Sequence, residues 1–432
     1  MDYCARCVYP ANAKPAIILD EKGVCSGCRY HESRSSADWP AREKMLRELL
    51  EMYRRKASEQ KLPYDCIIPV SGGKDSLFQT HLLKTVYGMN PLLVTYNHSF
   101  NTPIGIRNLN NLVASLGCDL VRFTTNPQSA QRIAKYMLRK VGDITWHYHA
   151  GIRTFPLQVA AQYGIPLVVW GEHGFAELTG MFTLEDMVEF TKWSRREHDM
   201  RGYEPEDLLT EDSGILPADL GPYRYPSDER IDEIGVRGIY LSNFIDWDAK
   251  KQAELMIQKY GFSLHPGPRD RTFVLYGKTE DHANDVHDYL KYLKFGYGRS
   301  TDDASTEVRH GRMTREEAID LVEHYDHARP TTLDSYLRYL AVSEEEFETS
   351  IESMRDLSIW TKDHAGRWVV TDSVSQHRDD AQVEDARVPL VAAEERTFGS
   401  KNRGLYQVAG TVVDHSDDSR QSTGYPTDFV VL

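Results

Sequence analysis

The clearest chemical signal in the sequence is the hexapeptide Ser71-Gly72-Gly73-Lys74-Asp75-Ser76. It follows DCIIPV (65–70), an apolar run typical of a buried strand, and precedes a helical stretch. Two glycines let the backbone turn tightly toward an anion, and the helix that begins here adds its positive N-terminal end. The serine hydroxyls and the Lys74 ammonium can donate to phosphate oxygens, whereas the natural partner of Asp75 is Mg²⁺ bridging phosphates. We therefore predict that residues 71–76 bind phosphate, with Lys74 and Asp75 as catalytic groups and Asp75 as a magnesium ligand.

The hexapeptide is not a Walker A loop, because that pattern requires glycine where Ile68 stands and Ser or Thr where Asp75 stands. It resembles instead the PP-loop, SGG-x-DS, of the ATP pyrophosphatases. Those enzymes cleave ATP between the α and β phosphates and transfer AMP to an oxygen of the substrate. A plain strand–turn–helix connection is the alternative, which six matching residues in this context disfavour.

Four cysteines form a second pattern, in which Cys4-x2-Cys7 is followed after seventeen residues by Cys25-x2-Cys28. Two such pairs at this distance are typical of a zinc ribbon, where four thiolates surround one Zn²⁺ tetrahedrally. A closed four-cysteine site leaves no open coordination position, so we expect a structural role; an iron–sulfur cluster is the alternative. Cys66 and Cys118 lie in or beside predicted strands, and we expect both to be buried thiols.

The elements around these motifs alternate between strands and helices. Apolar strands are predicted over 65–70, 91–96, 118–125 and 165–170, with helices over 103–116, 127–140 and 148–163 between the later ones. This alternation predicts an α/β fold with a doubly wound parallel sheet. Further helices are predicted over 40–60, 248–262, 314–326 and 343–354, and residues 284–300 are predicted to be a helix that runs into a Gly-Tyr-Gly turn.

The predicted division of the chain has five parts. They are a zinc-ribbon module (1–38), a linking helix (39–63), a PP-loop domain (64–330) with an insertion at about 172–235, a helical extension (331–372) and an irregular tail (373–432).

Two further stretches indicate which group of PP-loop enzymes the chain resembles. They are WGEHGFAELTG (170–180) and the run from HDYLKYLKFGYGRSTDDAS to VRHGRMTREEAIDLVEHYD (287–326). With the cysteine pairs and the loop, they resemble the N-acetyl sugar amidotransferases, PP-loop enzymes that make acetamidino sugars for lipopolysaccharides and flagellar nonulosonic acids. The resemblance covers roughly residues 1–330. It implies the adenine nucleotide alpha hydrolase-like fold, the cofactors ATP and Mg²⁺, an acetamido sugar or nucleotide sugar as substrate, and ammonia from a separate glutaminase partner.

Other residues are weaker candidates. Glu172 follows the fourth predicted strand, at the sheet edge where ligands bind, and could hold Mg²⁺ or orient the amide or ammonia; a solvated loop carboxylate is the alternative. Lys294, Arg299 and Arg312 belong to a basic run that also holds Arg309 and Arg315, and we interpret them as binding substrate or phosphate. The alternative is a helix face paired with Glu307, Glu316 and Glu317. Asp302 is a candidate metal ligand, and Asn97 and His98 are candidates for an adenosine pocket. His147 and His149 could bind a metal, but two histidines without a nearby third ligand are more often ordinary side chains.

Composition excludes some classes of protein. The 432 residues include 51 Lys and Arg against 65 Asp and Glu, a net charge of −14, which disfavours a nucleic-acid-coating protein. No apolar stretch approaches the ~18 residues of a spanning helix, and the N-terminus lacks a secretory pattern, so we expect a cytoplasmic protein. Two alternatives to an amidotransferase stay open: a PP-loop sulfur transferase acting on tRNA or a small molecule, and a non-catalytic nucleotide-binding or zinc-ribbon protein.

Overall fold

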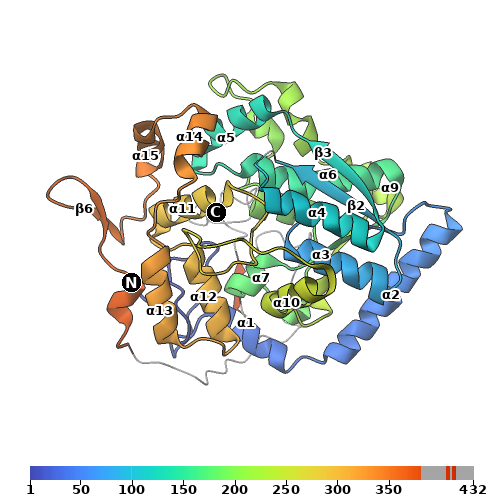
Figure 1. Ribbon diagram of the computed structural model, residues 1–432, viewed down its shortest axis with the longest axis horizontal. Helices are drawn as coiled ribbons and strands as arrows, with labels where there is room; N and C mark the ends of the chain where they lie inside the picture. The colour runs from blue at the N-terminus through green and yellow to red at the C-terminus, as the bar shows by residue number, and fades with distance from the viewer. Residues whose placement is uncertain (99, 381–404, 409–410, 415–432) are drawn as a thin grey trace.

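A five-stranded parallel sheet lies at the centre of the computed structural model, which describes residues 1–98, 100–380, 405–408 and 411–414 (Figure 1). Its strand order is β3-β2-β1-β4-β5. The strands are β1 (Cys66–Pro69), β2 (Pro91–Asn97), β3 (Asp119–Thr124), β4 (Leu167–Trp170) and β5 (Arg237–Tyr240). The chain runs outward from β1 to β3 and then returns to the other side of β1, so the sheet is doubly wound and the predicted fold class is confirmed.

Both faces of the sheet are covered by helices, which explains the apolar character of its central strands. Ile68 packs into a core with α2 (Trp39–Glu59), α3 (Lys74–His81), α4 (Pro103–Leu116) and α10 (Ala249–Tyr260). Its neighbour Ile67 points to the opposite face and packs against α6 (Trp146–Tyr163). The predicted strands and intervening helices are therefore present, with α5 (Pro127–Val141) preceding α6.

The connection from β4 to β5 contains only short elements. It holds α7 (Gly174–Thr179), α8 (Lys192–Ser194), α9 (Asp228–Ile234) and several 3-10 turns. This segment corresponds to the irregular insertion that the sequence indicates at about 172–235.

The C-terminal part is mainly helical. It contains α11 (Asn284–Phe295), α12 (Arg299–Arg309), α13 (Arg315–Tyr325), α14 (Leu333–Leu340) and α15 (Glu344–Glu352). The helix predicted to run into the Gly-Tyr-Gly turn ends at Phe295, because Gly296 takes a left-handed conformation with φ of 74°, and α12 then begins after the turn. The extension 331–372 also includes an antiparallel hairpin of β6 (Trp360–Lys362) and β7 (Trp368–Val370).

Much of the predicted tail, 373–432, lies outside the described residues. Within it, β8 (Leu405–Val408) pairs antiparallel with β9 (Thr411–Asp414).

The N-terminal module packs against the C-terminal helices (Figure 1). Its cysteines share a core with Phe295 and Tyr297, on either side of the turn between α11 and α12. The module is not loop throughout, because α1 (Ser26–Ser35) begins directly after Cys25. Among the helices of the described residues, none combines the length and apolar character that a membrane crossing requires.

Candidate active site

The predicted phosphate loop and Glu172 meet at one point of the sheet. Residues 71–73 follow β1, and Glu172 follows β4, the neighbouring strand at which the strand order reverses. In open α/β sheets, ligands bind outside the carboxyl ends of the strands at this switch point. A cavity of about 320 Å³ opens here, lined by Ser71, Gly73, Lys74, Asp75 and Glu172 among others.

Glycine is required in the loop for two reasons. Gly72 has a φ of 93°, and a Cβ at this position would lie 2.5 Å from the backbone oxygen of Gly105. The loop is also braced by its own serines, since the Ser71 N–H donates to Ser76 Oγ at 2.8 Å and the Gly73 N–H to Ser71 Oγ at 3.2 Å. Because α3 begins at Lys74, the positive end of that helix faces the cavity.

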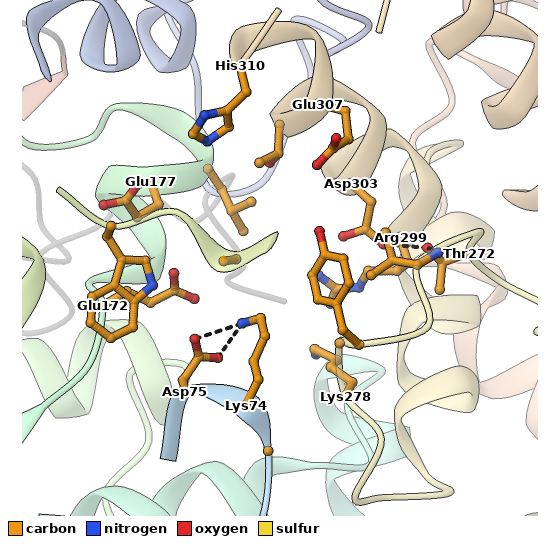
Figure 2. A pocket seen from close by; sticks show the side chains of 18 of the residues that line it. Lys74, Asp75, Glu172, Glu177, Thr272, Lys278, Arg299, Asp303, Glu307 and His310 are labelled. Atoms are coloured by element: carbon orange, nitrogen blue, oxygen red, sulfur yellow. Dashed lines mark hydrogen bonds and ion pairs between the residues drawn. The ribbon is translucent and has the colours of Figure 1, made fainter. Parts of the chain in front are cut away.

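Lys74, Asp75 and Glu172 form a charged group in the cavity (Figure 2). Lys74 Nζ donates to both carboxylate oxygens of Asp75, at 2.7 and 2.6 Å. Burial and the neighbouring Asp75 charge raise the pKa of Glu172 to about 7. Burial alone would lower the pKa of Lys74, but the carboxylates of Asp75 and Glu172 outweigh it and raise that pKa. Glu172 is therefore poised to exchange a proton near neutral pH.

The donor set at this point fits a magnesium ion. Asp75 and Glu172 offer carboxylate oxygens, the ligands that Mg²⁺ prefers, and Mg²⁺ is commonly held by one or two carboxylates together with substrate phosphates. Asp75 belongs to the loop itself and is the candidate ligand, whereas the raised pKa of Glu172 leaves that carboxyl group available for proton transfer.

The facing wall of the cavity comes from the C-terminal half of the chain (Figure 2). It includes Thr272, Lys278, Arg299, Asp303 and His310. Asp303 accepts a hydrogen bond from the Thr272 hydroxyl, and burial raises its pKa to about 6. Sequence reasoning missed Lys278, Glu280 and Asp303. Asp303 lies within the run that carries the family resemblance, whereas no local pattern marks Lys278 or Glu280.

The structure does not assemble the expected anion site from Lys294, Arg299 and Arg312. Of these three, only Arg299 lines the cavity, and its guanidinium donates to both carboxylate oxygens of Asp288 at 2.9 Å. Arg312 pairs with Glu307 at 2.7 Å and with Asp248 at 2.9 Å. Lys294 is buried away from the cavity and donates to the Gly142 carbonyl at 3.0 Å, and burial lowers its pKa to about 8. The pairing of Arg312 with Glu307 agrees with the alternative that the sequence left open, whereas the partners of Arg299 and Lys294 were not predicted from the sequence.

The weaker candidates also have partners inside the protein. Asp302 does not line the cavity; it is buried and accepts hydrogen bonds from Tyr9 and from Lys291, the latter at 2.7 and 2.8 Å. His98 lies 3.6 Å from Asp281 and lines a small pocket together with His147. Asn97 donates to the Thr124 hydroxyl at the sheet edge.

The four N-terminal cysteines form a compact, buried site. Their sulfur atoms all lie within 4.8 Å of one another, with 3.9 Å between Cys4 and Cys28 and 3.7 Å between Cys7 and Cys25. A single tetrahedral zinc with Zn–S bonds of about 2.3 Å places its sulfurs about 3.8 Å apart, so the set fits one such ion. Within the described residues, no other group of three or more His, Cys, Asp or Glu side chains is arranged to hold a metal.

Gly27 allows the cysteine module to pack closely against its neighbours. Gly27 lies inside α1 and has no left-handed backbone. A Cβ there would come within 2.4 Å of Arg309 Nη2 and 2.7 Å of the Leu178 oxygen, so glycine allows close packing instead of a turn. Cys66 and Cys118 are buried thiols, as predicted, and neither lines the cavity.

Comparisons with known proteins bear on the C-terminal half. Residues 254–375 match the family model described as "LPS biosynthesis protein WbpG-like, C-terminal domain". One curated relative, "Uncharacterized protein MJ1599" of Methanocaldococcus jannaschii, is 32% identical over 120 residues, which are 27% of this chain and 41% of that protein. The chain thus spans less than half the length of this relative.

Three solved structures are more distantly similar. NMN synthetase from Francisella tularensis has a TM-score of 0.32 and 12% sequence identity, and the match covers 64% of this chain and 94% of that one. NH3-dependent NAD synthetase from Campylobacter jejuni has a TM-score of 0.25 and 13% identity, with coverage of 51% of this chain and 84% of that one. The U34-tRNA thiolase NcsA from Methanococcus maripaludis, with its [4Fe-4S] cluster, has a TM-score of 0.21 and 13% identity, with coverage of 82% of this chain and 97% of that one. These scores are low, and nothing about the chemistry of this chain follows from them. The family model, in contrast, agrees with the motifs of residues 287–326, and over residues 254–375 this chain is similar to the WbpG-like proteins of lipopolysaccharide biosynthesis.

Proposed function

We propose that this protein is an ATP-dependent, AMP-forming amidotransferase that converts an acetamido group on a sugar into an acetamidino group. One observation carries the proposal: the SGGKDS loop opens at the switch point of a parallel sheet onto a cavity that Glu172 also lines. The WbpG-like match supports a biosynthetic enzyme of this kind. An acetamido sugar or nucleotide sugar is the proposed substrate.

The reaction must make a poor electrophile reactive. The amide oxygen attacks the α-phosphorus of ATP, the bond from that phosphorus to the bridging oxygen breaks, and pyrophosphate leaves with the electron pair. Ammonia then adds to the imidate carbon, a proton is lost from nitrogen, and AMP departs with the former amide oxygen. Such a reaction depends on positioning and on stabilising phosphate charge, with no covalent nucleophile from the protein.

The chain's own residues suit these tasks. The backbone N–H groups of the loop, with Ser71, Ser76 and Lys74, bind the departing phosphates. Asp75 would hold Mg²⁺, which supplies charge neutralisation when it is bound. In its ionised form, Glu172 accepts the proton that the attacking ammonia loses. We propose that a separate glutaminase supplies the ammonia, because we recognise no glutaminase Cys-His-Glu set in this sequence.

The test is incubation of the protein with ATP, Mg²⁺, ammonium and a panel of acetamido sugars. We expect AMP and pyrophosphate in equal amounts and a product that has gained one nitrogen and lost one oxygen. ADP as the product, or no turnover with any acetamido compound, would count against the proposal.

A sulfur transferase that uses the same adenylation remains the second candidate, acting on tRNA or a small molecule. Persulfide chemistry needs an accessible thiol, whereas Cys66 and Cys118 lie outside the cavity lining and burial raises the pKa of both thiols. Cys66→Ser and Cys118→Ser variants should therefore keep full activity. Loss of turnover in either correctly folded variant would favour the sulfur transferase.

A further inference from the structure

One short segment of the C-terminal half, Gly277–Glu280, lies against the phosphate loop. Two sets of contacts hold it there. Arg269 donates to the Gly277 carbonyl at 2.6 Å, and the Thr102 N–H donates to the Glu280 carbonyl at 3.0 Å. A Cβ on Gly105 would come within 2.5 Å of Glu280 Cα, so the segment touches α4 directly. It is therefore a fixed part of the cavity wall.

Lys278, a residue of this wall, has a strained backbone conformation. Its φ of 46° is left-handed, a conformation that costs a side-chain-bearing residue energy and is often found where function requires it. The side chain lines the cavity near Arg299 (Figure 2), but Arg299 is neutralised by Asp288. Within the described part of the chain, Lys278 has no hydrogen bond or ion pair of its own. A cation without a partner in a cavity is ready to bind an anion.

Glu280 places a negative charge on the anion-binding loop itself. Its Oε1 accepts a hydrogen bond from the Ser71 hydroxyl at 3.1 Å. Both its carboxylate oxygens lie close to Gly73, at 3.1 and 3.3 Å from the position of a Cβ on that residue. Its Oε2 is buried without a hydrogen-bond partner. Glu280 is therefore bonded to Ser71 and adjacent to Gly73, two residues of the loop that is expected to bind phosphate oxygens.

We propose that the segment Lys278–Glu280 completes the pyrophosphate site: Lys278 is its second lysine, opposite Lys74, and Glu280 is an internal anion that an incoming phosphate displaces from Ser71. This inference rests on the proposed function, because it assumes that residues 71–76 bind the β and γ phosphates of ATP. It assigns opposite effects to two residues that are two positions apart.

The experiment measures pyrophosphate and ATP binding by calorimetry, with Mg²⁺ present, for wild type and four variants. Lys278→Gly should weaken pyrophosphate binding about tenfold or more, because a charge-assisted contact is lost. Its melting temperature should stay equal or rise, since glycine adopts the left-handed conformation without strain. Glu280→Gln keeps the shape of the side chain and removes the competing charge, so it should tighten pyrophosphate binding severalfold.

Matched controls come from α2. Lys44 is 77% exposed and Glu48 is 68% exposed, and neither lines the cavity. Lys44→Met and Glu48→Gln remove the same charges from the protein at a distance from the loop, and they should leave binding unchanged.

The possible results distinguish a failure of this inference from a failure of the proposed function on which it rests. If wild type binds neither ATP nor pyrophosphate, the proposed function itself fails. If wild type binds both, but Lys278→Gly behaves like Lys44→Met, Lys278 is not a phosphate ligand and the inference is wrong. Weaker or unchanged pyrophosphate binding by a folded Glu280→Gln would also overturn it, because a carboxylate that helps binding is not a displaced competitor.

Discussion

Arg309 Nη2 lies 3.6 Å from the sulfur of Cys25, while Nη1 of the same guanidinium donates to the Leu178 carbonyl at 2.8 Å. One side chain thus connects the four-cysteine site to the segment that follows Glu172. Arg309 also lines the cavity, as does His31 from α1. The cysteine module is therefore part of the architecture of the active-site cavity, although it holds none of the phosphate-binding residues.

The first prediction concerns the metal. We expect elemental analysis to find about one zinc per chain, because the four sulfurs fit a single tetrahedral ion. Cys25→Ser removes one ligand and should lower the melting temperature markedly, since metal binding and folding are coupled in such modules. Cys118→Ser is the matched control and should lower it little. A protein that contains no zinc, or several irons per chain, would contradict the zinc assignment.

A second prediction concerns the phosphate loop. Lys74→Ala and Asp75→Ala should each reduce kcat by about a hundredfold or more, the usual effect of losing a group that stabilises transition-state charge. Neither should unfold the protein, because both side chains line the open cavity and the Asp75 side chain is 37% exposed. Circular dichroism and steady-state kinetics check both statements, with Lys44→Met as control. Near-normal rates in the two variants would refute the assigned roles.

A third prediction concerns pH. Burial and Asp75 raise the pKa of Glu172 to about 7, so the ionised base accumulates only as the pH passes through that value. We expect kcat/KM at saturating ammonia to rise across this range, and Glu172→Gln to remove that limb of the profile.

The same pKa has a consequence for stability. Between the unfolded value near 4.5 and about 7, the native state binds more protons than the unfolded state, so this group makes stability fall as the pH rises. Glu172→Gln should therefore be more stable than wild type above pH 7 and lose that advantage at pH 4. An equal difference in melting temperature at both pH values would show that Glu172 has an ordinary pKa.

A fourth prediction tests whether Arg299 is free to bind an anionic ligand or serves to pair the buried carboxylates of Asp288 and Asp302. Asp288 is 1% exposed and Asp302 is 2% exposed, and both lie within ion-pair distance of Arg299. Arg299→Met should destabilise the protein by about 3–5 kcal/mol, because it leaves buried carboxylates without compensation. Arg367→Met, at a position 79% exposed, is the control. A loss of stability below about 1 kcal/mol in urea unfolding would restore Arg299 as a free ligand.

Local sequence patterns account for one side of the site. β1, the loop and α3 are contiguous, and an apolar run followed by two glycines and a helix fixes their arrangement without distant contacts. Glu172 could be placed for the same reason, since it directly follows a buried strand. Glu280 could not, because its approach to Ser71 joins residues 209 positions apart. The pairing of Arg312 with Asp248 depends likewise on tertiary packing, since these residues are 64 positions apart.

The most direct test of the central claim is a crystal structure with Mg²⁺ and an ATP analogue whose α–β bridge is a methylene group. Our account places the β and γ phosphates on the N–H groups of residues 72–74, with Lys74 and Lys278 on opposite sides and Glu280 released from Ser71. A triphosphate bound elsewhere in the protein, or a loop that still holds Glu280 while the nucleotide is bound, would contradict it.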